Sequence, residues 1–200
     1  MIETIKVGPL ATNCYIVYDD KSKEAIVIDP GYEDDDIVEF IEKNELKLKY
    51  IYLTHCHFDH IEGANWLKNK FDAKVLTYFA EEENMKDSNV NLSKMMMGDP
   101  LLVKPDKLMF ENDEIEVGSI TFRVMHTPGH TSGSSALYDG ENLFSGDTVF
   151  KDTFGRTDFP TGNMHEMIKT VDRLLTLPST TKVFPGHNEA TVIGEIRPLE

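Results

Sequence analysis

Hydrophobic residues along the chain alternate between short β-type runs and longer stretches with helical spacing. Strands are predicted where short runs rich in apolar and β-branched residues are bounded by polar or Gly/Pro turns. In the first half of the chain these are residues 2–7, 14–18, 25–28, 50–53 and 73–76. In the second half they are residues 114–117, 120–125, 135–138, 143–144 and 182–184. Helices are predicted over 34–44, 61–70 and 163–177, where apolar residues recur three and four positions apart.

The strands therefore form two groups, each closed by helices. No linker, low-complexity tract or short repeat separates them, so we expect one domain over residues 1–200. Two strand groups with helices at their ends favour an α/β sandwich of two mixed sheets with the helices on the outer faces.

Residues 80–100 interrupt this pattern. The run Glu81-Glu82-Glu83 is predicted to begin a helix, and the polar stretch after it carries Met95-Met96-Met97. Two interpretations are open for this segment: a surface helix and loop, or a flexible flap close to a functional site.

Metal-binding chemistry is concentrated in the run His55-Cys56-His57-Phe58-Asp59-His60, directly after the strand at 50–53. Strand alternation sends His55 and His57 to one side and Cys56 into the core. Asp59 and His60 open the next helix and point about 100° apart. Histidine is the commonest metal ligand, and carboxylate oxygen accompanies it at hydrolytic sites. Two ligand pairs aimed at neighbouring points suit two ions better than one.

Three later turns that contain glycine carry similar side chains. His130 lies in Thr-Pro-Gly-His-Thr, Asp147 in Ser-Gly-Asp-Thr and His187 in Phe-Pro-Gly-His. Each follows a predicted strand, which is where α/β proteins place their sites. The other histidines fit other roles: we expect His126 to be structural at a strand end and His165 to be solvated at the start of the last helix.

Charge and cysteine content limit the kinds of molecule that the protein is expected to bind and the cellular compartment in which we expect it. The net charge is −15, with 35 acidic and 20 basic residues, which disfavours nucleic acid and anionic membrane surfaces. Cys14 and Cys56 show no disulfide pattern, which indicates a reducing compartment. The N-terminus lacks a signal-peptide pattern and no apolar stretch has the length of a membrane span, so we expect a cytoplasmic protein.

The complete motif, His-x-His-x-Asp-His followed by His, Asp and a final His, resembles that of the metallo-β-lactamase superfamily. The resemblance covers residues 29–187 and implies a four-layer αβ/βα sandwich. It also implies one divalent ion held by His55, His57 and His130, a second held by Asp59, His60 and His187, and Asp147 as the bridge between them.

Three further residues are candidates for supporting the centre or contacting the substrate. Asp29 matches a family position that implies a carboxylate steadying the motif loop, with a simple turn aspartate as the alternative. Arg156 lies in Gly-Arg-Thr-Asp-Phe, a stretch similar to one in glyoxalase II-like hydrolases and persulfide dioxygenases. It either clamps a substrate carboxylate or pairs with Asp158. Lys151 is a weaker candidate for substrate contact.

The C-terminal residues distinguish between glyoxalase II-like hydrolases and persulfide dioxygenases. It is similar to short bacterial glyoxalase II-like proteins, and Gly186 stands where persulfide dioxygenases typically have Ala. Full-length glyoxalase II adds a helical domain that binds glutathione. Because this sequence ends 13 residues after His187, we expect that domain to be absent.

We therefore predict a binuclear metal-dependent hydrolase acting on a small-molecule acyl thioester. A hydroxide bridging the metals attacks the acyl carbonyl, and Asp59 orients or deprotonates that water. Nitrogen and oxygen donors accept Zn, Fe or Mn, with Zn expected first. The alternative is a mononuclear iron persulfide dioxygenase. A nuclease of the superfamily is disfavoured by the charge, and a non-enzymatic metal module by the complete ligand set. The sequence predicts no oligomeric state.

Overall fold

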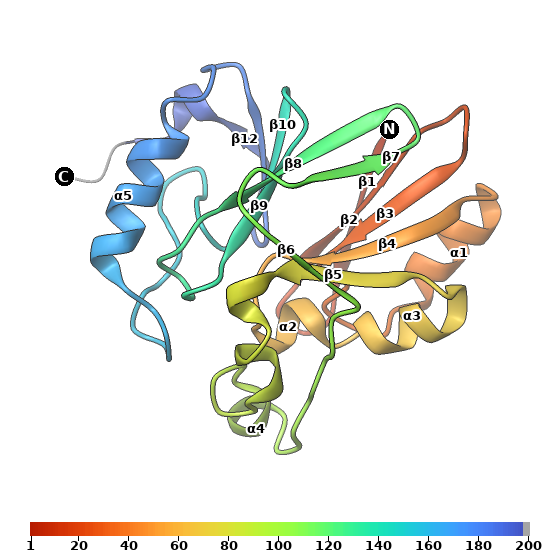
Figure 1. The fold of residues 1–200 in the computed structure, drawn as a ribbon, viewed down its shortest axis with the longest axis horizontal. Coiled ribbons are helices and arrows are strands. Elements are labelled where there is room, and N and C mark those ends of the chain that lie inside the picture. Colours follow the sequence, from red (N-terminus) through yellow and green to blue (C-terminus); the bar gives the residue numbers. More distant parts are fainter. Residues whose placement is uncertain (198–200) are drawn as a thin grey trace.

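Two six-stranded sheets lie face to face at the centre of the molecule (Figure 1). The structure is a computed structural model that describes residues 1–197. The first sheet has the order β1 (Ile2–Val7), β2 (Thr12–Tyr18), β3 (Glu24–Ile28), β4 (Lys47–Leu53), β5 (Lys74–Tyr78) and β6 (Lys107–Met109). The second has the order β12 (Thr191–Val192), β11 (Lys182–Pro185), β10 (Asn142–Gly146), β9 (Ser135–Tyr138), β8 (Ile120–His126) and β7 (Glu114–Val117). Both sheets mix parallel and antiparallel pairs.

Helices cover the outer face of each sheet. Helices α1 (Asp35–Lys43), α2 (Phe58–Ile61) and α3 (Ala64–Phe71) contribute to the core cluster on the first sheet, and α5 (Met164–Leu174) packs on the second. Figure 1 shows these helices on opposite sides of the paired sheets. This arrangement of helix, sheet, sheet and helix confirms the predicted four-layer α/β sandwich.

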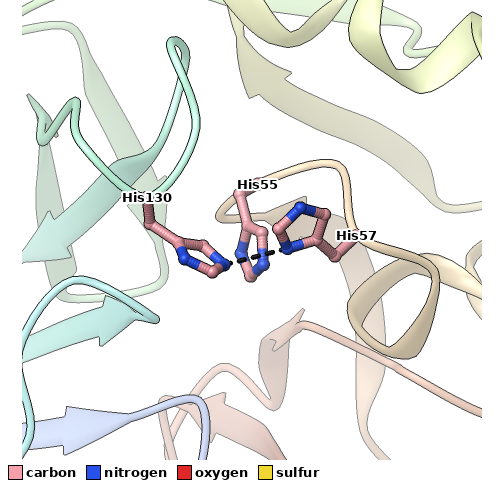
Figure 2. A group of neighbouring side chains, drawn as sticks. All are labelled: His55, His57 and His130. Atoms are coloured by element: carbon pink, nitrogen blue, oxygen red, sulfur yellow. Dashed lines mark hydrogen bonds between the residues drawn. The ribbon is translucent and has the colours of Figure 1, made fainter. Parts of the chain in front are cut away.

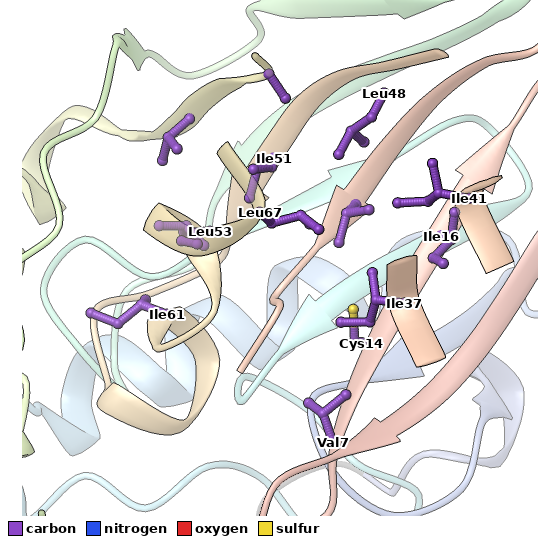
Figure 3. Close-up of a cluster of buried hydrophobic side chains, with 14 of the residues drawn as sticks. Val7, Cys14, Ile16, Ile37, Ile41, Leu48, Ile51, Leu53, Ile61 and Leu67 are labelled. Carbon is purple, nitrogen blue, oxygen red and sulfur yellow. The ribbon is translucent and has the colours of Figure 1, made fainter. Parts of the chain in front are cut away.

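Alternation along each strand divides the core into layers. On β2, Cys14 and Ile16 face the helices, in the cluster shown in Figure 3, whereas Tyr15 and Val17 face the second sheet. Both faces of the strand are therefore buried, which explains its nearly continuous apolar sequence. Each fully buried aliphatic side chain contributes about 1.5–3 kcal/mol.

The predicted helix at 61–70 is two helices, α2 and α3, that meet at Gly63. The amide of Gly63 donates to the carbonyl of Pro30 at 2.8 Å. A Cβ at this position would lie 2.3 Å from the carbonyl oxygen of Tyr32. The loop after β3 therefore packs directly against the chain at this break, which fixes α2 beside the end of β4.

Residues 79–101 also differ from the sequence prediction. Instead of a helix from Glu81, the structure has 3₁₀ turns at Phe79–Glu81 and Asn84–Lys86 and the single-turn helix α4 (Ser93–Met96). The short strands β6 and β12 were not predicted. No helix in residues 1–197 is both long enough and apolar enough to cross a membrane.

Candidate metal centre

The loops that follow strands of both sheets meet at one edge of the sandwich. The run containing His55 follows β4, and the loop containing His130 follows β8. Asp147 comes directly after β10, and His187 follows β11. Since β3 and β4 are parallel, as are β10 and β11, both sheets present carboxyl ends of parallel strands at this edge.

The first group consists of His55, His57 and His130, drawn in Figure 2. His130 Nε2 lies 2.9 Å from His57 Nδ1, and one ligand nitrogen from each ring lies within 4.8 Å of the others. All three residues are buried. The group therefore joins two residues of the first-sheet loop to one of the second-sheet loop.

The second group consists of Asp59, His60 and His187. His187 Nε2 lies 3.2 Å from Asp59 Oδ2 and 3.3 Å from His60 Nε2. His60 is fully buried, whereas 22% of the His187 side chain is exposed. This group is thus closer to solvent than the first.

Asp147 lies between the two groups. Its Oδ1 is 3.5 Å from His60 Nε2, and its Oδ2 is 3.7 Å from both His130 Nε2 and His187 Nε2. One carboxylate therefore reaches nitrogens of both groups, as the bridging role requires.

Carboxylate and carbonyl oxygens orient the outer nitrogens of the rings. Asp29 Oδ2 lies 2.9 Å from His60 Nδ1, and the carbonyl of Arg156 lies 2.7 Å from His130 Nδ1. Such partners fix the tautomer and direction of a ligating imidazole. Asp29 also lies within 4.8 Å of His55 and His60. Because its oxygens already accept from the amide and hydroxyl of Thr54, at 2.8 and 2.7 Å, we assign it to orientation rather than ligation.

Divalent ions fit this set of residues. His55 Nε2, His57 Nε2 and Asp147 Oδ1 are buried without a hydrogen-bond partner. Leaving a buried polar atom unpaired costs about 1–3 kcal/mol. The unsatisfied nitrogen and oxygen donors match the preferences of Zn, Fe and Mn.

The local charges also favour cations. Burial, reinforced by neighbouring imidazoles, lowers the pKa of His55 and of His57, so both rings stay neutral, as ligands must. Burial alone would also lower the pKa of His60, but the carboxylates of Asp147, Asp59 and Asp29 outweigh it and raise that pKa to about 10. These three carboxylates create a negative potential where the second group converges.

The remaining predicted residues lie outside the two groups. Cys56 is buried in the core between the first sheet and its helices, as alternation predicted. Arg156 forms a two-point ion pair with Asp158, at 2.7 Å for both contacts. His126 stacks on Tyr78 in a separate part of the molecule. His165 and Lys151 are exposed, and neither lines the cavity at the centre.

A cavity of about 380 Å³, here called the metal cavity, opens onto both groups. His57, Asp59, His130, Asp147 and His187 line it, together with the apolar residues Leu10, Phe58, Leu92, Met96, Phe150 and Phe159. Leu92 and Met96 come from segment 80–100, so this segment lies against the centre; the flexibility of the predicted flap stays a prediction. Sequence reasoning missed these two as individual wall residues; apolar residues within a polar loop are the signal that identifies them.

Sequence reasoning also missed Glu81, whose carboxylate is fully buried next to the centre. Glu81 accepts hydrogen bonds from the hydroxyl of Thr131, the neighbour of His130, and from Asn84 at 2.8 Å. The thiol of Cys56 also contacts it. It thus ties the His130 loop to the His55 run. A run of three glutamates resembles a solvated surface, so no local signal marks its first residue as buried.

Comparisons with known proteins agree with this geometry. A sequence profile described as the metallo-beta-lactamase superfamily matches residues 7–187. A probable metallo-hydrolase, YqgX, of Bacillus subtilis is 34% identical over 92% of this chain and 89% of its own length. The hydroxyacylglutathione hydrolase GloC of Haemophilus influenzae is 32% identical over 97% of this chain and 93% of its own.

Solved structures show the same fold. BLEG-1, a B3 metallo-beta-lactamase, superposes with a TM-score of 0.90 at 34% identity, covering 98% of this chain and 95% of its own. TTHA1623, solved in a di-iron-bound form, gives 0.83 at 31% identity, covering 96% and 95%. ETHE1 from Myxococcus xanthus gives 0.79 at 29% identity, covering 98% and 80%.

Proposed function

This chain belongs to the metallo-beta-lactamase superfamily, and from that premise we propose that it is a binuclear metal-dependent hydrolase that cleaves thioesters in the manner of glyoxalase II. One observation carries the proposal: Asp147 lies between a three-histidine group and a group of one aspartate and two histidines. Two adjacent sites that share a carboxylate are typical of two-ion hydrolytic centres.

Different side chains of the chain have different roles in this proposal. His55, His57 and His130 would hold one ion, Asp59, His60 and His187 the other, and Asp147 both. Divalent ions in such a centre polarise a carbonyl and lower the pKa of water. Asp59 is held by His187 and by the hydroxyl of Thr12, at 3.4 Å from its Oδ2.

Asp59 is the residue that orients the attacking water in this proposal. Burial raises the pKa of its carboxyl, but His60 and His187 outweigh burial and hold that pKa below its usual range. An ionised carboxylate at the cavity wall accepts a hydrogen bond from water and aims it at the substrate. The departing thiolate needs little help from an acid, since thiols have a pKa of about 8.5.

Gly186 supports two ions over one. A Cβ at this position would lie 2.3 Å from Asp147 Oδ1 and 2.5 Å from the Cε1 atom of His60. The alanine typical of persulfide dioxygenases would therefore displace both residues. The second candidate, a mononuclear iron persulfide dioxygenase, is favoured by one observation: the three-histidine group is compact enough to hold an ion alone.

A thioester panel that includes lactoyl-glutathione tests the proposal, with the protein loaded in turn with Zn, Fe and Mn. Metal content, thiol release and oxygen uptake are measured on the same samples. Thiol release at two ions per chain, without oxygen uptake, is the expected result. One iron per chain together with oxygen consumption on a persulfide would replace the hydrolase with the second candidate.

A further inference from the structure

A second cavity, of about 280 Å³, opens beside the metal cavity and is here called the side cavity. Leu10, Phe58, Asp59 and Met96 line both cavities, so the two lie side by side. At about 30 Å³ per water, the side cavity has room for roughly nine waters, or for an organic group of similar size. A molecule whose reacting carbon lies in the metal cavity can therefore extend into it.

The walls of the side cavity are mostly apolar, and the polar side chains among them include Thr12 and the carboxylates of Asp59 and Glu62. Pro9, Tyr32 and Met97 supply apolar surface beyond the shared residues, and Glu62 supplies a carboxylate. Among the residues that the structure describes, its lining includes no lysine or arginine. A carboxylate entering this space would lose its hydration without gaining a cationic partner, which is unfavourable.

The metal cavity is lined by one arginine that could pair with an anionic arm, and this arginine is already engaged. Arg156 is the basic residue on its wall, and its Nε and one terminal nitrogen already contact the two oxygens of Asp158. The guanidinium also stacks over the ring of Phe159, 3.8 Å from its centre. A substrate carboxylate would have to compete with this ion pair.

We propose that the side cavity binds an uncharged, apolar arm of the thioester, and that Glu62 and Met97 select against arms that end in a carboxylate. This inference rests on the proposed thioester hydrolysis. Burying one methylene favours binding by up to about fourfold. Where the arm in the side cavity is the thiol, glutathione, which carries carboxylates, is a poorer arm than a neutral alkyl thiol.

The kinetic test varies one arm of the substrate at a time. The acyl chain is lengthened from acetyl to octanoyl on 2-mercaptoethanol, and the thiol chain is lengthened with the acyl group kept as acetyl. Each long compound has a partner ending in a carboxylate. On one of the two arms, kcat/KM is expected to rise at least tenfold with length and to fall at least tenfold with the terminal carboxylate. A flat response on both arms, or a preference for the carboxylate, overturns the inference.

Matched variants locate the effect in the side cavity. Met97→Glu is expected to lower kcat/KM for the long neutral substrate about tenfold. Met95→Glu makes the same change two positions earlier, at a residue that is 63% exposed and lines neither cavity, and serves as the control. Glu62→Lys is expected to improve turnover of the carboxylate-ended substrate. Equal losses in the two methionine variants contradict the assignment.

Binding to the metal-depleted protein separates this inference from the proposed function. Calorimetry with hexanethiol and with 6-mercaptohexanoate measures the preference of the cavity without any turnover. Tighter binding of hexanethiol, weakened by Met97→Glu and unchanged by Met95→Glu, supports the side cavity even if no thioester is hydrolysed. Equal binding of the two probes rejects it even if hydrolysis is rapid.

Discussion

Asp147 contributes an oxygen to each half of the centre. Its Oδ1 faces His60, and its Oδ2 faces both His130 and His187. An amide in place of the carboxylate offers one oxygen and removes a negative charge. In the proposed two-ion centre, metal binding would therefore depend more on this side chain than on any ligand that belongs to a single group.

Asp147→Asn is expected to lower metal content and hydrolysis together, with activity reduced at least a hundredfold. The control is Asp152→Asn, the same change at an exposed aspartate of the following loop. Metal analysis of the purified proteins and thioester assays give the two readouts. Full activity in Asp147→Asn would show that the carboxylate does not bridge.

Gly186→Ala is expected to reduce the metal content from two ions toward one. The added methyl group would overlap Asp147 and His60, whereas the three-histidine group lacks this contact. Gly194→Ala is the control, because its Cβ would meet only Ser179, at 3.1 Å, away from the centre. Two ions per chain in Gly186→Ala would contradict the predicted crowding.

Glu81→Gln tests the buried carboxylate through the pH dependence of stability. Burial raises the pKa of Glu81 above its usual value, so the folded protein holds this proton more tightly than the unfolded chain. Its contribution to stability is complete below the usual carboxyl pKa, about 4.3, and is lost as the pH rises through the folded value.

Urea denaturation from pH 4 to 8 measures this effect. The free energy of unfolding of Glu81→Gln should improve relative to the unmodified protein as the pH rises. The exposed neighbour variant Glu83→Gln should show no such trend. A constant difference between Glu81→Gln and the unmodified protein across this range would argue against the raised pKa.

The sequence predicts the metal-ligand residues better than the residues that hold them in place. The His55 run and the turns at His130, Asp147 and His187 are recognisable because ligand type and spacing are local. Glu81 was missed because its burial depends on the distant Thr131 loop, which no local pattern encodes. The two roles predicted for Arg156 had a different cause: its partner Asp158 is only two residues away, but the sequence does not show whether the guanidinium pairs with it or with a substrate.

At the scale of elements, the segment over the centre is held by Asn91. Its carbonyl accepts from the amide of Phe58 at 2.9 Å, and its side chain donates to the carbonyl of Leu101 at 2.7 Å. The next residue, Leu92, has a positive φ of 66°, which is unfavourable for a bulky side chain. The hydrogen bonds of Asn91 therefore hold a conformation that places Leu92 on the wall of the metal cavity.

Asn91→Ala is expected to loosen residues 84–101 while the sheets stay intact. Amide hydrogen exchange in this segment should rise at least tenfold, because the side-chain bonds that close the loop are lost. Asn89→Ala, at an exposed position of the same loop, provides the comparison. Unchanged exchange in Asn91→Ala would mean that other contacts hold the segment.

Elements with a longer apolar run or clear helical spacing were predicted, whereas short or interrupted ones were not. Strand β2 is apolar on both faces and was found from its sequence. Strand β6 has only three residues, too few for a recognisable sequence pattern, and it joins the sheet by pairing with β5. The break between α2 and α3 comes from the loop packed against Gly63, a tertiary contact that helical spacing does not record.

At the scale of the whole molecule, the centre joins the two sheets. The His55 run belongs to the first sheet, whereas His130, Asp147 and His187 follow strands of the second. Direct hydrogen bonds near the centre also join the two sheets, for example from the hydroxyl of Tyr15 to the carbonyl of Pro185 at 2.6 Å and from the amide of Asn13 to the carbonyl of Gly186 at 2.7 Å. Bound ions would therefore add cross-links between the halves.

Removing metal with a chelator is expected to lower the thermal midpoint by about 5–10 °C. Ligand present at about 100 times its dissociation constant stabilises by about 2.7 kcal/mol, and each kcal/mol shifts a chain of this size by about 2–4 °C. Calorimetry before and after chelation, and after metal is returned, measures the shift. Asp147→Asn should show a smaller difference, and an unchanged midpoint in the unmodified protein would rule out the cross-link.

The absence of a side chain at Gly186 also bears on how such a centre can change during evolution. Glycine and alanine codons differ at a single nucleotide, and the alanine methyl group would meet both Asp147 and His60. In the proposed two-ion centre, a single nucleotide change would therefore crowd the shared aspartate and one ligand of the second group, while both sheets keep their fold.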